Sequence, residues 1–99
     1  MSEEEKEERK RAAAIKYDAG KWDAPRLIAK GVGLIAEKIL ETARKHDIPI
    51  HFDPDLSKLL SKLELDSDIP ADLYQAVAEV LAVIYKANKE KAKRITIGI

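Results

Sequence analysis

The chain has 99 residues, of which 18 are basic and 18 are acidic, and it contains no cysteine. This length supports one modest hydrophobic core and therefore one domain. The balanced charge provides no overall field that would concentrate the protein on nucleic acid or an acidic membrane, and the missing cysteine excludes a disulfide scaffold and thiolate zinc sites.

The first eleven residues are almost all charged. Ser2 and Glu5 have the spacing of a capping box, which predicts a short, solvated helix in this segment. A secretory signal would show a basic end and then an apolar stretch, and no apolar run approaches the roughly 20 residues that span a bilayer. We therefore expect a protein that is not exported by that route and that meets membranes only indirectly.

The first apolar run, residues 12–17, is predicted to be a strand because it contains Ile15 and Tyr17, which favour extended structure. A turn that ends at Pro25 follows, since proline restricts its own backbone and that of the residue before it. The next five residues, 26–30, are predicted to form a second strand.

An amphipathic helix is predicted at residues 33–45. Its apolar side chains recur every four residues, at Ile35, Ile39 and Ala43, and charged side chains take the other face. Residues 48–52 are then predicted to be a third strand. The strand–helix–strand order predicts that the second and third strands run parallel through a right-handed crossover, which indicates an α/β sheet.

Two further helices are predicted in the second half of the chain. Asp53 can cap a short helix at residues 55–62, whose apolar face is formed by Leu56, Leu59, Leu60 and Leu63. The last helix is predicted at residues 71–91. Its polar side chains between residues 73 and 87 fall on one narrow stripe, so it is either buried on two sides or leaves an apolar patch for a partner.

Residues 95–99 have the composition of a strand, but we predict a disordered end because chain termini are usually loose. The alternative is a strand added to a sheet edge, in the same chain or in another. The predicted fold is thus α/β, with a small mixed sheet of about three strands surrounded by helices. A single domain at 12–91 lies between a charged segment at 1–11 and a tail at 92–99.

The densest set of metal-ligand side chains lies between residues 46 and 55 and consists of His46, Asp47, His51, Asp53 and Asp55. Pro54 interrupts the extended chain that would align them. Helix capping and the helix dipole explain the two aspartates that flank this proline better than metal binding does. Residues 66–68 begin like a calcium loop, yet a proline stands where a third ligand belongs. We predict no metal and no cofactor.

Gly31 and Gly33 flank a predicted helix start and could offer backbone N–H groups to a phosphate, although the pattern is no Walker loop or dinucleotide fingerprint. This motif supports a second hypothesis, a regulator that binds a small ligand or phosphate. No hydroxyl stands in the context of a catalytic nucleophile, so we predict that the chain is not an enzyme. The basic tail is better explained as a solvated helix end than as a nucleic-acid site.

Trp22 lies in the predicted turn, where it either covers the edge of the core or serves as a contact anchor for a partner. A third hypothesis is self-assembly through Ile95–Ile99, which a chain truncated after Arg94 would test.

Several segments taken together resemble a known family: residues 16–18, 23–25, 29–31, 48–50 and 69–81. The chain is similar from about residue 12 to 85 to the cytoplasmic domain of the FlhB/YscU family, the export-apparatus switch protein of flagellar and type III secretion systems. This resemblance implies a compact α/β domain and a place in the cytoplasm, at the inner face of the membrane.

The family cuts itself at an Asn-Pro-Thr-His motif that precedes the strand matching residues 12–17. In this sequence the aligned residues are Glu7, Glu8, Arg9 and Lys10, so the motif is absent and self-cleavage is not expected. The strand before the cut and the membrane region have no counterpart, and we therefore expect a free-standing relative of the fragment that follows the cut.

The resemblance also implies a protein-binding surface. In the family, an apolar patch formed by the Ala-Pro turn and the last helix is implicated in docking export substrates. With the tryptophan of the same turn, the predicted binding residues are Trp22, Ala24, Pro25, Ala78 and Leu81. We expect a module that binds export substrates or export-apparatus proteins, and we expect a charge at position 78 or 81 to abolish binding while the fold stays intact.

Overall fold

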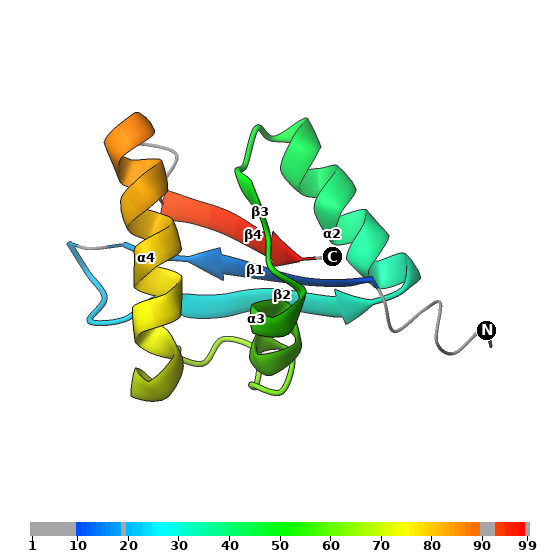
Figure 1. The fold of residues 1–99 in the computed structure, drawn as a ribbon, viewed down its shortest axis with the longest axis horizontal. Coiled ribbons are helices and arrows are strands. Elements are labelled where there is room, and N and C mark those ends of the chain that lie inside the picture. Colours follow the sequence, from blue (N-terminus) through cyan, green and yellow to red (C-terminus); the bar gives the residue numbers. More distant parts are fainter. Residues whose placement is uncertain (1–9, 19, 90–92, 99) are drawn as a thin grey trace.

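The computed structural model describes residues 10–18, 20–89 and 93–98 (Figure 1). The elements, in chain order, are β1 (Arg11–Lys16), β2 (Arg26–Val32), α2 (Leu34–Lys45), β3 (Ile50–Phe52), α3 (Pro54–Leu60), α4 (Ala71–Ala87) and β4 (Arg94–Gly98). The predicted α/β class is confirmed, and each predicted strand and each helix from residue 33 onward has a counterpart. The short helix predicted near Ser2 lies outside the described residues.

The sheet has four strands in the order β2-β1-β4-β3. β1 is antiparallel to both of its neighbours, β2 and β4, and β3 is parallel to β4. β2 and β3 therefore run in the same direction, as the strand–helix–strand order predicted. They are not adjacent, however, because they form the two edges of the sheet.

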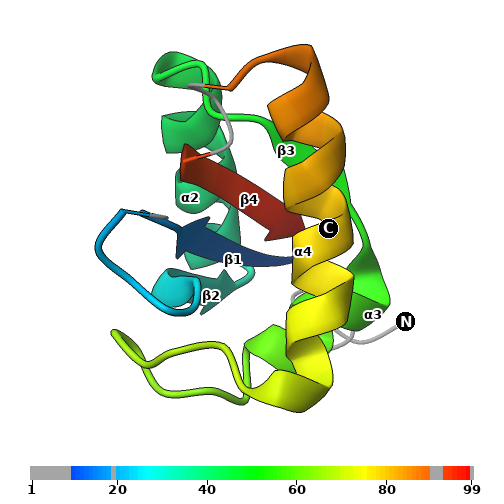
Figure 2. The same ribbon diagram turned by 90° about the vertical axis from the view of Figure 1, so that its left-hand side faces the viewer.

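Helices cover both faces of the sheet (Figure 2). On one face, α2 packs Ala36 and Leu40 against Ala12 of β1. Of the predicted stripe, Ala43 is buried and Ile39 is partly buried, whereas Ile35 is 59% exposed and Ala36 takes the buried position at the start of the helix. Ile35 lies over Gly31, where a β-carbon would come within 2.2 Å of its Cγ2 atom, so the glycine lets the start of α2 approach β2.

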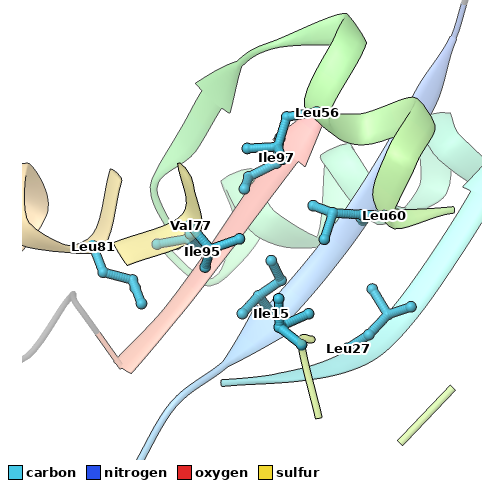
Figure 3. Close-up of a cluster of buried hydrophobic side chains, with 10 residues drawn as sticks. Ile15, Leu27, Leu56, Leu60, Val77, Leu81, Ile95 and Ile97 are labelled. Atoms are coloured by element: carbon cyan, nitrogen blue, oxygen red, sulfur yellow. The ribbon is translucent and has the colours of Figure 1, made fainter. Parts of the chain in front are cut away.

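The main core lies on the other face, beneath α3 and α4 (Figure 3). It includes side chains of five elements: Ile15 of β1, Leu27 of β2, Leu56 and Leu60 of α3, Val77 and Leu81 of α4, and Ile95 and Ile97 of β4. The predicted cap of α3 is confirmed, because an Asp53 carboxylate oxygen accepts a hydrogen bond from the Leu56 N–H at 3.0 Å. Leu59, predicted on the apolar face, is 45% exposed because the buried face of α3 is formed by Leu56, Ser57 and Leu60.

The prediction of a disordered end is wrong for residues 94–98, which form the inner strand β4. Ile95 and Ile97 are fully buried. The Tyr17 N–H donates to the Lys93 carbonyl at 2.9 Å and extends the ladder beyond the strand. Both neighbours of β4 lie more than forty residues earlier in the sequence. Long-range strand pairing therefore holds this segment in place, and no local sequence pattern indicates that pairing. The last helix is also shorter than predicted and ends at Ala87.

Candidate protein-docking groove

A groove of about 710 Å³ lies between α4 and the loop that joins β1 to β2. The described residues that line it are Tyr17, Asp18, Gly20 and Pro25 from the loop, Tyr74, Ala78, Leu81, Ala82, Tyr85 and Lys86 from α4, and Lys89 and Lys93 from the segment before β4. We call this surface the docking groove. It brings together two segments that are about fifty residues apart in the sequence.

Local hydrogen bonds hold the loop in its position beside α4. The N–H groups of Lys21 and Trp22 donate to the Asp18 carbonyl at 3.0 and 2.8 Å, which closes a tight turn. At the other end of the loop, the Pro25 carbonyl accepts from the Ile69 N–H at 2.8 Å. Ile69 is two residues before α4, so this bond places the buried Pro25 next to the start of the helix.

The α4 side of the groove follows from helical spacing. Tyr74, Ala78, Ala82 and Tyr85 are separated by four, four and three residues and therefore share one face of the helix. The two alanines between two tyrosines leave a low apolar floor between larger side chains. A helix face of this shape can accept an apolar side chain from a partner.

Leu81 belongs to both the groove and the core. It lines the groove, yet it is only 8% exposed and packs in the cluster of Figure 3. A charge at this position would be buried, which is costly without a partner, so Leu81 is not a position where binding can be changed with the fold left intact. This corrects the expectation for position 81. Ala78, which is half-buried, remains suitable.

Two tyrosines meet where the loop touches α4. A hydrogen bond joins the side chains of Tyr17 and Tyr74. Partial burial, followed by this hydrogen bond, raises the pKa of the Tyr17 hydroxyl above its ordinary value. The neutral phenol is therefore the form that links the loop to the helix.

The rim of the groove is basic. Lys86, Lys89 and Lys93 line it, and Asp18 is the acidic side chain among the described lining residues. Because the chain as a whole has equal numbers of acidic and basic residues, this is a local excess of positive charge. Such a rim attracts a partner segment that carries carboxylates.

The structure places Pro25, Ala78 and Leu81 of the predicted set in the groove, whereas Trp22 and Ala24 are not among its lining residues. The Trp22 ring instead lies 4.3 Å from the Arg26 guanidinium carbon and 5.6 Å from the Lys16 ammonium. These cation–π contacts fasten the loop to β1 and β2. Ala24 is half-buried beside Pro25.

The residues that line the groove but were absent from the predicted set include Tyr17, Tyr74, Ala82, Tyr85 and the lysines. The sequence could have indicated the groove residues of α4. Tyr74 and Ala82 lie four residues before and after Ala78, and Tyr85 lies three residues after Ala82, which places them on the same face of a helix. No sequence signal identifies Tyr17 or Lys93 as neighbours of α4, since Tyr17 directly follows β1, Lys93 directly precedes β4, and only the fold brings both to the helix.

The structure also describes the residues of the other sites considered from the sequence. Within the described residues, no group of three or more His, Cys, Asp or Glu side chains is arranged to hold a metal ion. The Gly33 N–H, considered for phosphate binding, already donates to the Lys10 carbonyl at 2.9 Å. Over the same part of the chain, no helix has the length and apolar character needed to cross a bilayer.

The fold agrees with comparisons to known proteins. A family described as the FlhB HrpN YscU SpaS Family matches residues 9–84. The chain therefore belongs to this family of flagellar and type III secretion export-apparatus proteins, as the resemblance indicated.

Individual relatives fall into two size classes. YlqH of Bacillus subtilis is 41% identical over 80 residues, which cover 81% of this chain and 86% of YlqH. The flagellar biosynthetic protein FlhB of Salmonella typhimurium is 40% identical over 79 residues, which cover 79% of this chain but 21% of that protein. The chain thus spans about a fifth of the length of the FlhB proteins that it matches.

Solved structures show the same fold. The crystal structure of the cytoplasmic domain of FlhB from Shewanella putrefaciens superposes with a TM-score of 0.74 at 42% identity, over 79% of this chain and 66% of that one. The PscU C-terminal domain gives a TM-score of 0.71 at 32% identity, over 75% of this chain and 95% of that one.

Proposed function

We propose that this chain is a non-enzymatic protein-binding domain that docks export substrates or export-apparatus proteins in the docking groove. The observation that carries the proposal is the convergence of Pro25 with Ala78 and Leu81 on one apolar groove, although they come from separate parts of the sequence. Membership of the export family supplies the class of partner. The cytoplasmic FlhB domain of similar structure supports a site of action on the cytoplasmic side of the membrane.

The groove favours a partner segment with a particular chemistry. Its floor is apolar and accepts an aliphatic or aromatic side chain, which supplies most of the binding free energy. The three lysines on its rim favour Asp or Glu residues beside that anchor. The proposed partner segment therefore combines one apolar anchor with flanking carboxylates.

A charge in the groove tests the proposal. Ala78→Asp places a carboxylate on the apolar floor, where it loses solvation when the partner binds, and is expected to weaken binding at least ~10-fold. The control is Val83→Asp, on the same helix at a side chain that is 70% exposed and that does not line the groove. Binding of purified export substrates and cytoplasmic export-apparatus domains is measured by calorimetry.

The circular dichroism spectra of both variants should match that of the parent chain. Equal loss of binding in the two variants, or unchanged binding in Ala78→Asp, would exclude the docking groove as the binding surface.

A further inference from the structure

β4 lies outside the part of the chain that matches the family, although it is an inner strand of the sheet. The family match ends at residue 84, and β4 begins at Arg94. β4 pairs in antiparallel fashion with β1 and in parallel with β3. The matched segment thus contains both neighbours of this strand but not the strand itself.

Without β4, the two neighbouring strands have no common hydrogen-bonding partner. Adjacent strands lie about 4.8 Å apart, so β1 and β3 are separated by roughly 10 Å, which is too far for direct pairing. Each would present unpaired N–H and C=O groups toward the other. The matched segment therefore leaves a slot that is one strand wide and has a hydrogen-bonding edge on each side.

The slot also selects side chains. Ile95 and Ile97 point into the main core, and neither is exposed. Thr96 is buried on the opposite face of the strand. At Gly98, a β-carbon would come within 2.5 Å of the Arg11 carbonyl oxygen, so the backbones are too close for any side chain. These four positions define a pattern of alternating apolar residues that ends in glycine.

We propose that the space between β1 and β3 is a strand-binding site, which this chain fills with its own β4. Its ligand class is an extended segment that runs antiparallel to β1, with aliphatic side chains at the positions of Ile95 and Ile97 and glycine at that of Gly98. Recognition rests on backbone pairing and alternate side chains, so the site also accepts such a segment from a separate polypeptide.

The test releases β4 from the folded protein. A recognition sequence for a site-specific protease is inserted after Lys89 in the full chain, and the protein is cut after folding. The cut strand is expected to remain with the body during native size-exclusion chromatography. A fluorescein-labelled peptide of residues 93–99, in excess, is expected to replace it and to give a saturable rise in anisotropy.

Two controls make the result specific. The same peptide with Gly98→Val is expected to bind about 10- to 100-fold more weakly, because its side chain meets the Arg11 backbone. The uncut chain is expected to take up little of the parent peptide, because its slot is occupied.

Five results would overturn the proposal, and the first four concern the cut protein and the two peptides. They are elution of the strand apart from the body, loss of the folded circular dichroism signal on cutting, no saturable binding of the peptide, and equal binding of the two peptides. Equal uptake by the cut and uncut chains would overturn it as well, since the peptide would then bind elsewhere.

Discussion

The centre of the sheet and the docking groove are both apolar, but they differ in what covers them. Ile95 and Ile97 are enclosed by helices and strands, whereas Ala82 and Tyr85 remain exposed on α4. α4 buries one face in the core, and the neighbouring face lines the groove beside the β1–β2 loop and the segment before β4. The comparison teaches that the core and the proposed binding surface use separate side chains of one helix and sheet, and that Leu81 belongs to both.

The largest expected effect is on the stability of the sheet centre. Ile97→Ala removes a fully buried side chain and is expected to lower the free energy of unfolding by ~2–5 kcal/mol, measured by urea denaturation. The matched control, Val83→Ala on the exposed part of α4, should change it by less than ~0.5 kcal/mol. Similar values for both variants would show that β4 is not part of the core.

Leu81 provides the next test because it is shared by both regions. Leu81→Ala is expected to cost ~2–5 kcal/mol of stability and also to weaken partner binding. Ala78→Asp should cost less than ~1 kcal/mol, chiefly through helix propensity, while it weakens binding strongly. Urea denaturation and calorimetry on the two proteins separate the effects. Unchanged stability of Leu81→Ala would contradict the place of Leu81 in the core, and unchanged binding would contradict its place in the docking groove.

The basic rim should contribute less than the apolar floor. Reversing the charge in Lys86→Glu is expected to slow association with an acidic partner several-fold, and the effect should shrink as salt is added. Lys62→Glu, an exposed substitution away from the groove, is the control. Stopped-flow measurements at low and high salt give the rates, and a rate that does not respond to Lys86→Glu would argue against electrostatic selection of the partner.

The smallest expected effect concerns the link between the loop and α4. The pKa of Tyr17 is raised in the folded chain, so the folded state holds this proton more tightly than the unfolded state, in which the pKa is about 10. The stabilisation is present below about pH 10 and is lost as the pH rises through the folded value. Tyr17→Phe should therefore make stability fall less steeply above about pH 10, measured by urea denaturation.

Tyr85→Phe, on the exposed end of the groove, is the matched variant. An identical fall in stability for Tyr17→Phe and the parent chain would contradict a protonated Tyr17 that links the loop to α4.

Sequence patterns predicted most of the scaffold because its signals are local. The cap at Asp53, the proline before α4 and the apolar run that includes Ile15 each specify structure within a few residues. The same local spacing placed Ala78 on a helix face, and the family resemblance added Pro25 as its partner.

The features that the sequence did not predict depend on contacts between distant residues. Residues 94–98 were assigned to a loose tail because nothing near them indicates that β1 and β3 lie on either side. The role of Trp22 likewise depends on Arg26 and Lys16, which approach its ring only in the folded sheet.

Chemical-shift mapping tests the docking groove most directly. A ¹⁵N-labelled chain is titrated with a purified export substrate or cytoplasmic export-apparatus domain that binds it. The largest shifts are expected at Ala78, Ala82 and Tyr85 and in the described part of the loop at residues 17–25, with little change in α2. Shifts centred on α2 or on β3, with the groove unaffected, would contradict docking at this surface.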